Sequence, residues 1–464
     1  MASIISTGIG SGLDIAGIVQ QLVAAEAQPI ETRIGRQEAR AQVRLSAYGN
    51  LKSALSEFQT QLDVMKDINQ FLARKATTGD ESLFSVEADT SALPSSYSVE
   101  IVQVAQTQKL NSGAFLDSDA VVGTGDLAIT VGVNSFSVEI TTDNNTLTGI
   151  RDAINEAPDN QGVAATIVNA DSGSYLILTG EKTGLSNSMT ITQSGGDGGL
   201  ASLEYDPVNG LNSLTESIAA QDAFIRIDGF DVMNETNSIS GAVQGVTIDL
   251  FEAAPGELVS LNVVNDEGVV RETVNSFVDS YNQLVQLFDQ LTSYDVENQV
   301  AGPLLGDATA RSIRDQIRRE MSTAVTDIEA NFSTLSEVGI QIQLDGALEI
   351  NEATLSDTLD ADFSNFGRLF AATDGFAVRL SDLVGGYLDD EGALESRTNG
   401  LNAQIEDIGD QREALNERLA RLEQRLLRQF NALDSLLGQL TQTSNFLAQQ
   451  LNNLPGFTTP SNGN

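Results

Sequence analysis

Apolar residues near both ends of the chain recur at steps of three and four, which is the spacing of a buried helix face. The N-terminal stripe runs over residues 30–65 and includes Leu45, Leu55 and Leu62. The C-terminal stripe runs over 401–451, and we take as its central members Leu415, Leu419, Leu422, Leu426, Leu433, Leu437 and Leu440. Because a buried leucine contributes about 1.5 kcal/mol or more, neither stripe can remain in water. We expect the two end helices to pair as a coiled-coil stalk.

The middle of the chain has a different pattern. Between 84 and 270, β-branched and aromatic residues alternate or cluster between Gly, Asn and Asp turns, which predicts antiparallel strands. Residues 146–157 are the exception, because their apolar positions have helix spacing. Helix spacing returns from 271, and alternation on both sides of Asp345-Gly346 predicts a hairpin.

These patterns predict an elongated α+β multidomain protein, with a coiled-coil helical stalk built from both chain ends and nested β-rich head domains. The predicted segments are a disordered or helical N-terminal leg at 1–40, a stalk domain from 41–75 with 271–435, a β-rich head domain from 76–115 with 216–270, a β-rich inserted head domain at 116–215, and a C-terminal leg at 436–464.

Composition excludes several classes of function. The 464 residues carry a net charge of -40, which argues against nucleic-acid partners and anionic membrane surfaces, since both bind clustered Lys and Arg. Cysteine and histidine are absent, which removes thiolates, imidazole bases and most zinc or copper ligands. No apolar run approaches the roughly 18 residues of a membrane span. We therefore expect no enzyme, no catalytic or metal site and no cofactor.

Several segments resemble one known family. The N-terminal part contains "GIGSGLDIAGIVQQLVAAEAQPIETR" and "LSAYGNLKSALSEFQTQLDVMKD". The C-terminal part contains "LDGALEINEATLSDTL" and "LNERLARLEQRLLRQFNALDSLLGQLTQTSNFLAQQL". In order and spacing these segments resemble the flagellar filament-capping proteins, or hook-associated protein 2 family.

The resemblance implies a function and partners. It implies a structural cap at the distal tip of the bacterial flagellar filament, a ring of about five copies that promotes folding and insertion of exported flagellin and is needed for motility. It also implies secretion through the flagellar type III export channel, contact with hook-filament junction proteins, and a cytosolic export chaperone that binds near the C-terminus. The opening residues lack the basic start of a cleaved signal peptide, so we expect export without cleavage.

Two sets of residues are candidate contact sites. The resemblance makes the glycine-spaced start a leg segment that contacts filament subunits, with Gly8, Gly10, Gly12, Leu13 and Asp14. In an acidic chain, the arginines of the C-terminal helix are either a solvated face or contacts to acidic surfaces of neighbouring copies, and the candidates are Arg418, Arg421 and Arg425. The spacing of Glu417 and Arg421 supports the solvated face.

Other functions stay open at this stage. Another flagellar axial protein, such as a junction protein or a flagellin, would share the helical ends. The acidic middle domains could also act as an adhesin for host mucin or other glycans. An enzyme is the weakest alternative, because a carbohydrate-cleaving site uses aromatic platforms and the chain has no Trp.

Overall fold

The computed structural model describes residues 12–326, 328 and 330–452, and the chain divides into two compact units. The helical unit joins the two ends of the chain, Met1–Asp67 and Thr273–Asn464. The β unit is the middle of the chain, Ile68–Glu272. The predicted α+β multidomain fold is confirmed, with helices contributed by both ends and antiparallel sheets by the middle.

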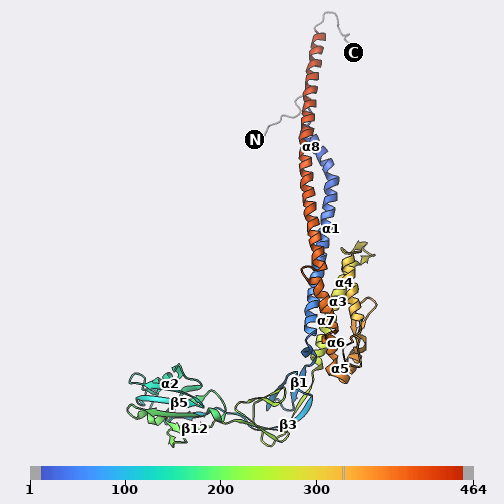
Figure 1. The fold of residues 1–464 in the computed structure, drawn as a ribbon. Helices are drawn as coiled ribbons and strands as arrows, with labels where there is room; N and C mark the ends of the chain where they lie inside the picture. The colour runs from blue at the N-terminus through green and yellow to red at the C-terminus, as the bar shows by residue number, and fades with distance from the viewer. Residues whose placement is uncertain (1–11, 327, 329, 453–464) are drawn as a thin grey trace, which may run out of the picture. The chain divides into compact units, whose positions relative to one another are not determined.

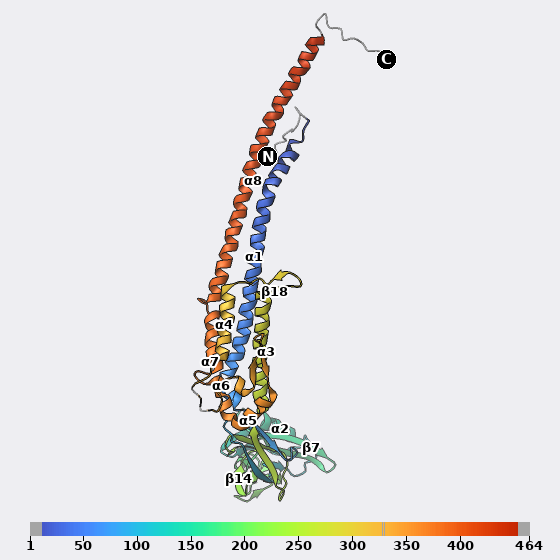
Figure 2. The ribbon, with the colours of Figure 1, turned by 90° about the vertical axis from the view of Figure 1, so that its right-hand side faces the viewer.

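Two long helices dominate the helical unit. Helix α1 (Ile15–Met65) begins where the carboxylate of Asp14 accepts a hydrogen bond from the Gly17 N–H at 3.0 Å. Helix α8 (Ala393–Asn452) lies beside it, as Figures 1 and 2 both show. The shorter elements are α3 (Glu267–Thr292, in this unit from Thr273), α4 (Ala308–Ser322), α5 (Glu352–Phe366), α6 (Arg368–Ala371), α7 (Phe376–Leu388), the 3₁₀ turn η4 (Ser336–Val338) and the hairpins β18 (Tyr294–Asp295) with β19 (Val300–Ala301) and β20 (Ile340–Ile342) with β21 (Leu348–Ile350).

Aromatic side chains form the core of the helical unit. The Phe58 ring of α1 lies 5.9 Å from the rings of both Phe277 and Tyr281 of α3. Phe277 in turn meets Phe370 of α6 at 6.2 Å with an edge-on geometry. Each of these side chains is buried. The C-terminal half of α1 is therefore held by several helices, not by α8 alone.

The β unit contains two separate cores. The first lies between a five-stranded sheet, ordered β1-β17-β3-β13-β14, and a three-stranded sheet, ordered β15-β16-β2. Its elements are η1 (Ile68–Phe71), β1 (Arg74–Thr78), β2 (Phe84–Ala88), β3 (Ser95–Gln103), β13 (Ala223–Ile227), β14 (Phe230–Asn234), β15 (Ser238–Val243), β16 (Val246–Leu250) and β17 (Val259–Asn265). The first and last strands pair directly, with Arg74 opposite Asn265. The chain therefore enters and leaves this unit on adjacent strands.

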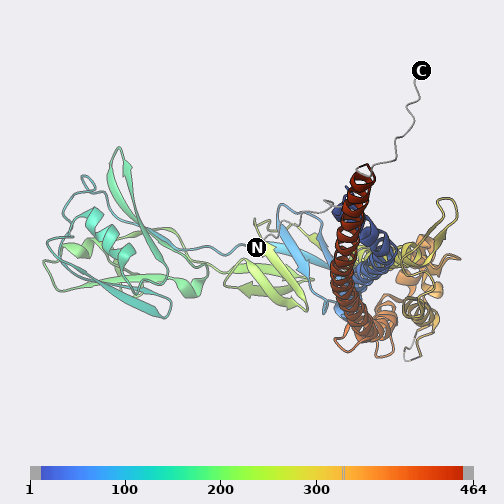
Figure 3. The ribbon, with the colours of Figure 1, turned by 90° about the horizontal axis from the view of Figure 1, so that it is seen from above.

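The second core is inserted between β3 and β13. It joins a sheet ordered β11-β10-β9-β5-β6 to a sheet ordered β12-β4-β8-β7, and helix α2 packs on β6 and β7 (Figure 3). Its elements are β4 (Lys109–Asn111), β5 (Gly125–Val131), β6 (Asn134–Ile140), α2 (Leu147–Glu156), β7 (Val163–Ala170), β8 (Gly173–Gly180), η2 (Leu185–Asn187), β9 (Met189–Ser194), η3 (Gly199–Leu203), β10 (Tyr205–Asp206), β11 (Leu211–Asn212) and β12 (Thr215–Ile218).

The inserted core is larger than the predicted segment 116–215. Strand β4 pairs with both β12 and β8, so residues 109–111 and 215–218 belong to the inserted sheet. Leu110 and Leu214 are buried in the same core. These strands are three and four residues long, and such short strands carry little alternation for a sequence pattern to detect.

Candidate interaction site on the paired terminal helices

Three ion pairs fix how α1 and α8 align. Lys52 meets Glu395 at 3.0 Å, Glu38 pairs with Arg412, and Glu26 meets Arg418 at 3.0 Å. As the α1 number falls, the α8 number rises, so the helices run antiparallel. The same alignment places the start of α1 near residue 432 of α8.

A narrow apolar seam lies between these ion pairs. It consists of Ala27 and Ile34 from α1 with Ile408, Leu415 and Leu419 from α8, and Leu422 packs against it. Apolar residues at this spacing on both helices are typical of a coiled-coil seam. The pairing of the two chain ends is thus built from residues separated by most of the sequence.

The remaining predicted seam residues differ in burial. On α1, Leu55 and Leu62 are fully buried where several helices meet, and Leu45 is half-buried. On α8, Leu426 and Leu437 are half-buried.

The predicted seam extends too far along α8. Leu433 is 50% exposed and Leu440 is 57% exposed, so neither is a seam residue within one chain. The physical reason is the length of the partner, because the described part of α1 reaches only to about residue 432 of α8. The apolar residues exposed on this last part of α8, which we call the α8 tip, are Leu433, Leu436, Leu440, Phe446, Leu447 and Leu451.

The candidate arginines of α8 lie around a hollow of about 470 Å³ beside Glu26 and Leu422. Arg418 crosses the seam to Glu26, and Arg421 meets Glu417 one turn away at 3.7 Å. Their side chains remain 64% and 73% exposed, so each pair contributes less than about 1 kcal/mol. Arg425 lines the same hollow and is exposed.

The leg residues are described only in part. Gly8 and Gly10 lie outside the described residues. Gly12 has a φ of +74°, a conformation that favours glycine. Leu13 and Asp14 are exposed, and Asp14 caps α1.

A partly buried polar cluster that the sequence did not predict joins α1, α4 and α8. Asp307 accepts hydrogen bonds from the Tyr48 hydroxyl at 2.6 Å, from the Thr309 and Ala310 N–H groups at 2.9 and 3.2 Å, and from Arg397 at 3.2 Å. Burial by itself raises the pKa of the Asp307 carboxyl, but these hydrogen bonds outweigh it and hold the pKa below its ordinary value. Burial, together with Asp307, raises the pKa of Tyr48. An Asp directly before a helix is a cap signal that sequence could have supplied.

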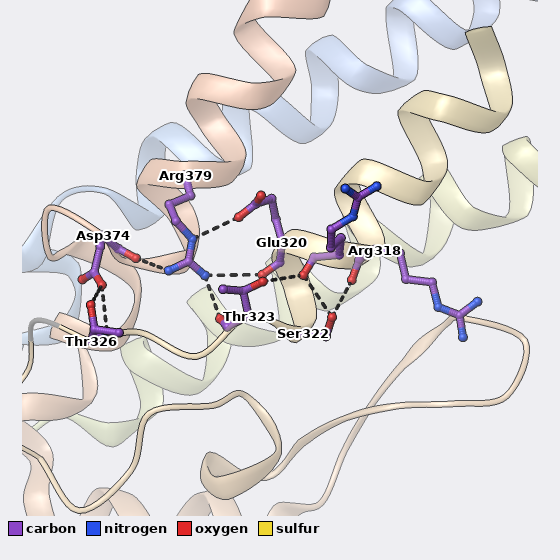
Figure 4. A network of polar contacts seen from close by, with 8 residues as sticks. Arg318, Glu320, Ser322, Thr323, Thr326, Asp374 and Arg379 are labelled. Carbon is purple, nitrogen blue, oxygen red and sulfur yellow. Dashed lines mark hydrogen bonds and ion pairs between the residues drawn. The ribbon is translucent and has the colours of Figure 1, made fainter. Parts of the chain in front are cut away.

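A second cluster fastens the end of α4 to α7 (Figure 4). Arg379 of α7 donates to the Glu320 carboxylate at 3.2 Å and to the carbonyl oxygen of Thr323 at 2.8 Å, and it also bonds the carbonyl oxygen of Asp374. Its guanidinium lies 5.0 Å from the centre of the Phe376 ring. Asp374 in turn accepts from both the N–H and the hydroxyl of Thr326, at 2.7 and 2.8 Å. The two clusters tie α4 to α1, α7 and α8 at the end of the helical unit that contains the aromatic core.

The paired helices expose apolar and charged side chains. Within residues 12–326, 328 and 330–452, no group of three acidic, His or Cys side chains is placed to hold a metal ion. No helix among the same residues is long and apolar enough to cross a bilayer. What the paired helices offer is exposed apolar and charged surface on a stiff support, which suits binding to other proteins.

Comparisons with known proteins agree with this. A family model described as the flagellar hook-associated protein 2 N-terminus matches residues 11–108, and one described as its C-terminus matches residues 220–442. The two matches stop and resume at the limits of the inserted core. The A-type flagellar hook-associated protein 2 of Pseudomonas aeruginosa is 33% identical, over 97% of this chain and 98% of the relative. Flagellar hook-associated protein 2 of Escherichia coli K12 is 32% identical, over 98% of this chain and 99% of the relative.

A solved structure gives the same result. The D1-D2-D3 domains of the flagellar cap protein FliD from Escherichia coli match with a TM-score of 0.67 and 30% identity, over 77% of this chain and 99% of that one. The nested units and paired end helices thus define a structural protein of the flagellum. This chain belongs to the flagellar hook-associated protein 2 family, the family of filament-cap proteins. The match favours the cap over the other axial proteins, and none of these relatives supports the adhesin alternative.

Proposed function

We propose that this chain caps the distal tip of the flagellar filament as a ring of about five copies, and that the ring promotes folding and insertion of exported flagellin. The observation that carries the proposal is the similarity to cap proteins over 97% of the chain. As a capping protein, the chain acts by binding and templating rather than by catalysis.

The α8 tip is the part of the chain best suited to hold filament subunits. It exposes six large apolar side chains on a helix that has no described partner helix there. Apolar surface of this kind marks a protein-binding site. We propose that the tip and the leg residues Gly12, Leu13 and Asp14 contact flagellin, and that a cytosolic export chaperone covers the same C-terminal region before secretion.

The arginines around the hollow beside Glu26 have a second proposed role. Arg418 and Arg421 have acidic partners in their own chain. Their high exposure leaves donors for acidic groups of a neighbouring copy, and Arg425 extends the same surface. In this proposal Arg418, Arg421 and Arg425 set the register of copies in the ring.

The remaining parts of the proposal concern delivery. Export through the flagellar type III channel requires an unfolded chain, and the absence of cysteine leaves no disulfide to block unfolding. The ring would meet hook-filament junction proteins when the first flagellin subunits are added. It would then remain at the filament tip outside the cell.

A deletion strain tests capping. Cells without this gene are expected to be non-motile and to spill unpolymerised flagellin, and the full chain is expected to restore filaments. Two variants sharpen the test. Leu440→Gln with Leu447→Gln removes apolar surface from the α8 tip, whereas Leu116→Gln with Leu185→Gln changes two leucines between β4 and β12 that are still more exposed. Rescue by the second variant and not by the first supports the proposal, and normal filaments in the deletion strain would refute it.

A further inference from the structure

Four arginines occupy one face of α1 without acidic partners. Arg33, Arg36, Arg40 and Arg44 are separated by three, four and four residues, and all four are exposed. None of the four guanidinium groups forms an ion pair or hydrogen bond with another described residue. The acidic residue inside this stretch, Glu38, is already paired with Arg412 of α8. Like charges at this spacing destabilise a helix slightly, so in a chain of net charge -40 this basic stripe is a surface that suits an acidic partner.

The C-terminal part of the basic stripe borders a groove. Arg40 and Arg44 line a cavity of about 690 Å³ between α1, Gln404 of α8, and the end of β19 with the turn that follows it. Two exposed apolar side chains, Val43 and Leu305, line the same cavity. A groove with cationic walls and apolar patches fits an apolar segment that carries a carboxylate.

The chain itself carries such a segment. The β18–β19 hairpin extends from the end of α3 (Figure 2), and every residue from Tyr294 to Ala301 is exposed. Its apolar side chains Tyr294, Val296 and Val300 face solvent, with Val296 78% exposed.

The two carboxylates of the hairpin differ in their roles. Asp295 holds the turn by accepting from the N–H groups of Glu297 and Asn298 at 2.9 and 3.0 Å. The carboxylate of Glu297 has no partner among the described residues. A hairpin with two-residue strands is marginal on its own in water, so its exposed apolar surface points to a binding partner.

We propose that the β18–β19 hairpin of one copy docks into the α1 groove of a second copy of this chain. In this contact Glu297 faces Arg40 and Arg44, and Val296 covers Val43 and Leu305. The inference rests on the proposed ring and names one of its contact surfaces.

The contact is head-to-tail, because Val296 and Glu297 of one copy meet α1 and Leu305 of the other copy rather than the same hairpin residues. Each copy therefore binds one neighbour through its hairpin and the other neighbour through its groove. A repeated contact of this type closes into a ring when the rotation between copies allows it.

A charge swap in the full chain tests the pairing. The groove variant is Arg40→Glu with Arg44→Glu, the hairpin variant is Glu297→Arg, and the third variant combines all three changes. The control is Arg311→Glu with Arg319→Glu on α4, which makes the same charge change at exposed arginines elsewhere in the helical unit. Sedimentation equilibrium over a range of protein concentrations gives the self-association constant of each, at low and at high salt.

We expect the groove and hairpin variants each to weaken self-association about ten-fold or more, because attraction becomes repulsion at the contact. The combined variant is expected to recover most of the loss, and the control to stay near the wild type. High salt should reduce the differences.

Unchanged association in the single-site variants, or no recovery in the combined one, overturns the proposed contact. A groove or hairpin variant that self-associates normally but does not restore motility to the deletion strain also overturns the proposed contact, since the groove would then hold a different protein. A wild-type chain that stays monomeric at every concentration refutes the ring itself, which separates failure of the proposed function from failure of this contact.

Discussion

Replacing Asp307 with alanine is expected to be among the most destabilising single changes in the helical unit. The change removes the N-cap of α4, which costs about 1 kcal/mol. It also leaves the hydroxyl of the fully buried Tyr48 without its acceptor, at a cost of about 1–3 kcal/mol. The contact to Arg397, whose side chain is 45% exposed, adds less than about 1 kcal/mol. The expected loss is therefore about 2–5 kcal/mol.

A double-mutant cycle separates these contributions. Tyr48→Phe alone removes one charge-assisted hydrogen bond and is expected to cost about 1.5–3 kcal/mol. In the double variant, Tyr48→Phe with Asp307→Ala, no buried hydroxyl is left unpaired. The double variant should therefore be more stable than the sum of the single losses implies, by about 1–2 kcal/mol.

Urea unfolding of the full chain supplies the measurement. Far-ultraviolet circular dichroism follows the helical unit, and hydrogen exchange of α1, α4 and α8 assigns the transition, because two units need not unfold together. A loss below about 0.5 kcal/mol for Asp307→Ala, or strictly additive losses in the double variant, would refute the reasoning.

Three further outcomes follow from the structure. Hydrogen bonds hold the pKa of Asp307 below its ordinary value of about 3.9. The contribution of Asp307 to stability is therefore complete above that pH and is lost as the pH falls through the lowered pKa. Urea midpoints between about pH 5 and 3 should fall more steeply for the wild type than for Asp307→Asn. Leu415→Ala should weaken the α1–α8 pairing by about 2–5 kcal/mol and speed hydrogen exchange in the first half of α1. Leu433→Ala should change the stability of the monomer by less than about 0.5 kcal/mol. Equal effects of the two changes would contradict the alignment of α1 with α8. Gly195→Ala and Gly196→Ala both place alanine at positive φ, which costs about 1–2 kcal/mol. Only at Gly196 would the new Cβ lie 1.7 Å from the Thr124 carbonyl oxygen. Calorimetry of the β unit should therefore show a clearly larger loss of stability for Gly196→Ala.

Local elements were predictable where one segment carries its own signal. Helix α2 follows from the capping Thr146 and the spacing of Leu147, Ile150 and Ile154. The β20–β21 hairpin follows from alternation around its turn. In both places the interactions that decide the structure lie within about a dozen residues.

Long-range features were not predictable in the same way. The apolar stripe of α8 continues through Leu433 and Leu440, but periodicity does not encode where a partner helix begins. The bond between Tyr48 and Asp307 spans 259 positions in sequence, so no local pattern contains it. The basic stripe of α1 is visible in the sequence, but its lack of acidic partners is visible only once the surrounding residues are placed.

The nested arrangement of the two units determines when each can fold. The strands that open and close the β unit, β1 and β17, pair with each other, so that unit can fold as soon as residues 68–272 are all free. The seam of the helical unit joins Glu26 to Arg418, a separation of 392 positions. During synthesis, which starts at the N-terminus, α1 therefore has no partner helix until α8 has been made. The contact order of the helical unit is high although its structure is helical, and we expect it to fold last and more slowly than a helical bundle with local connections.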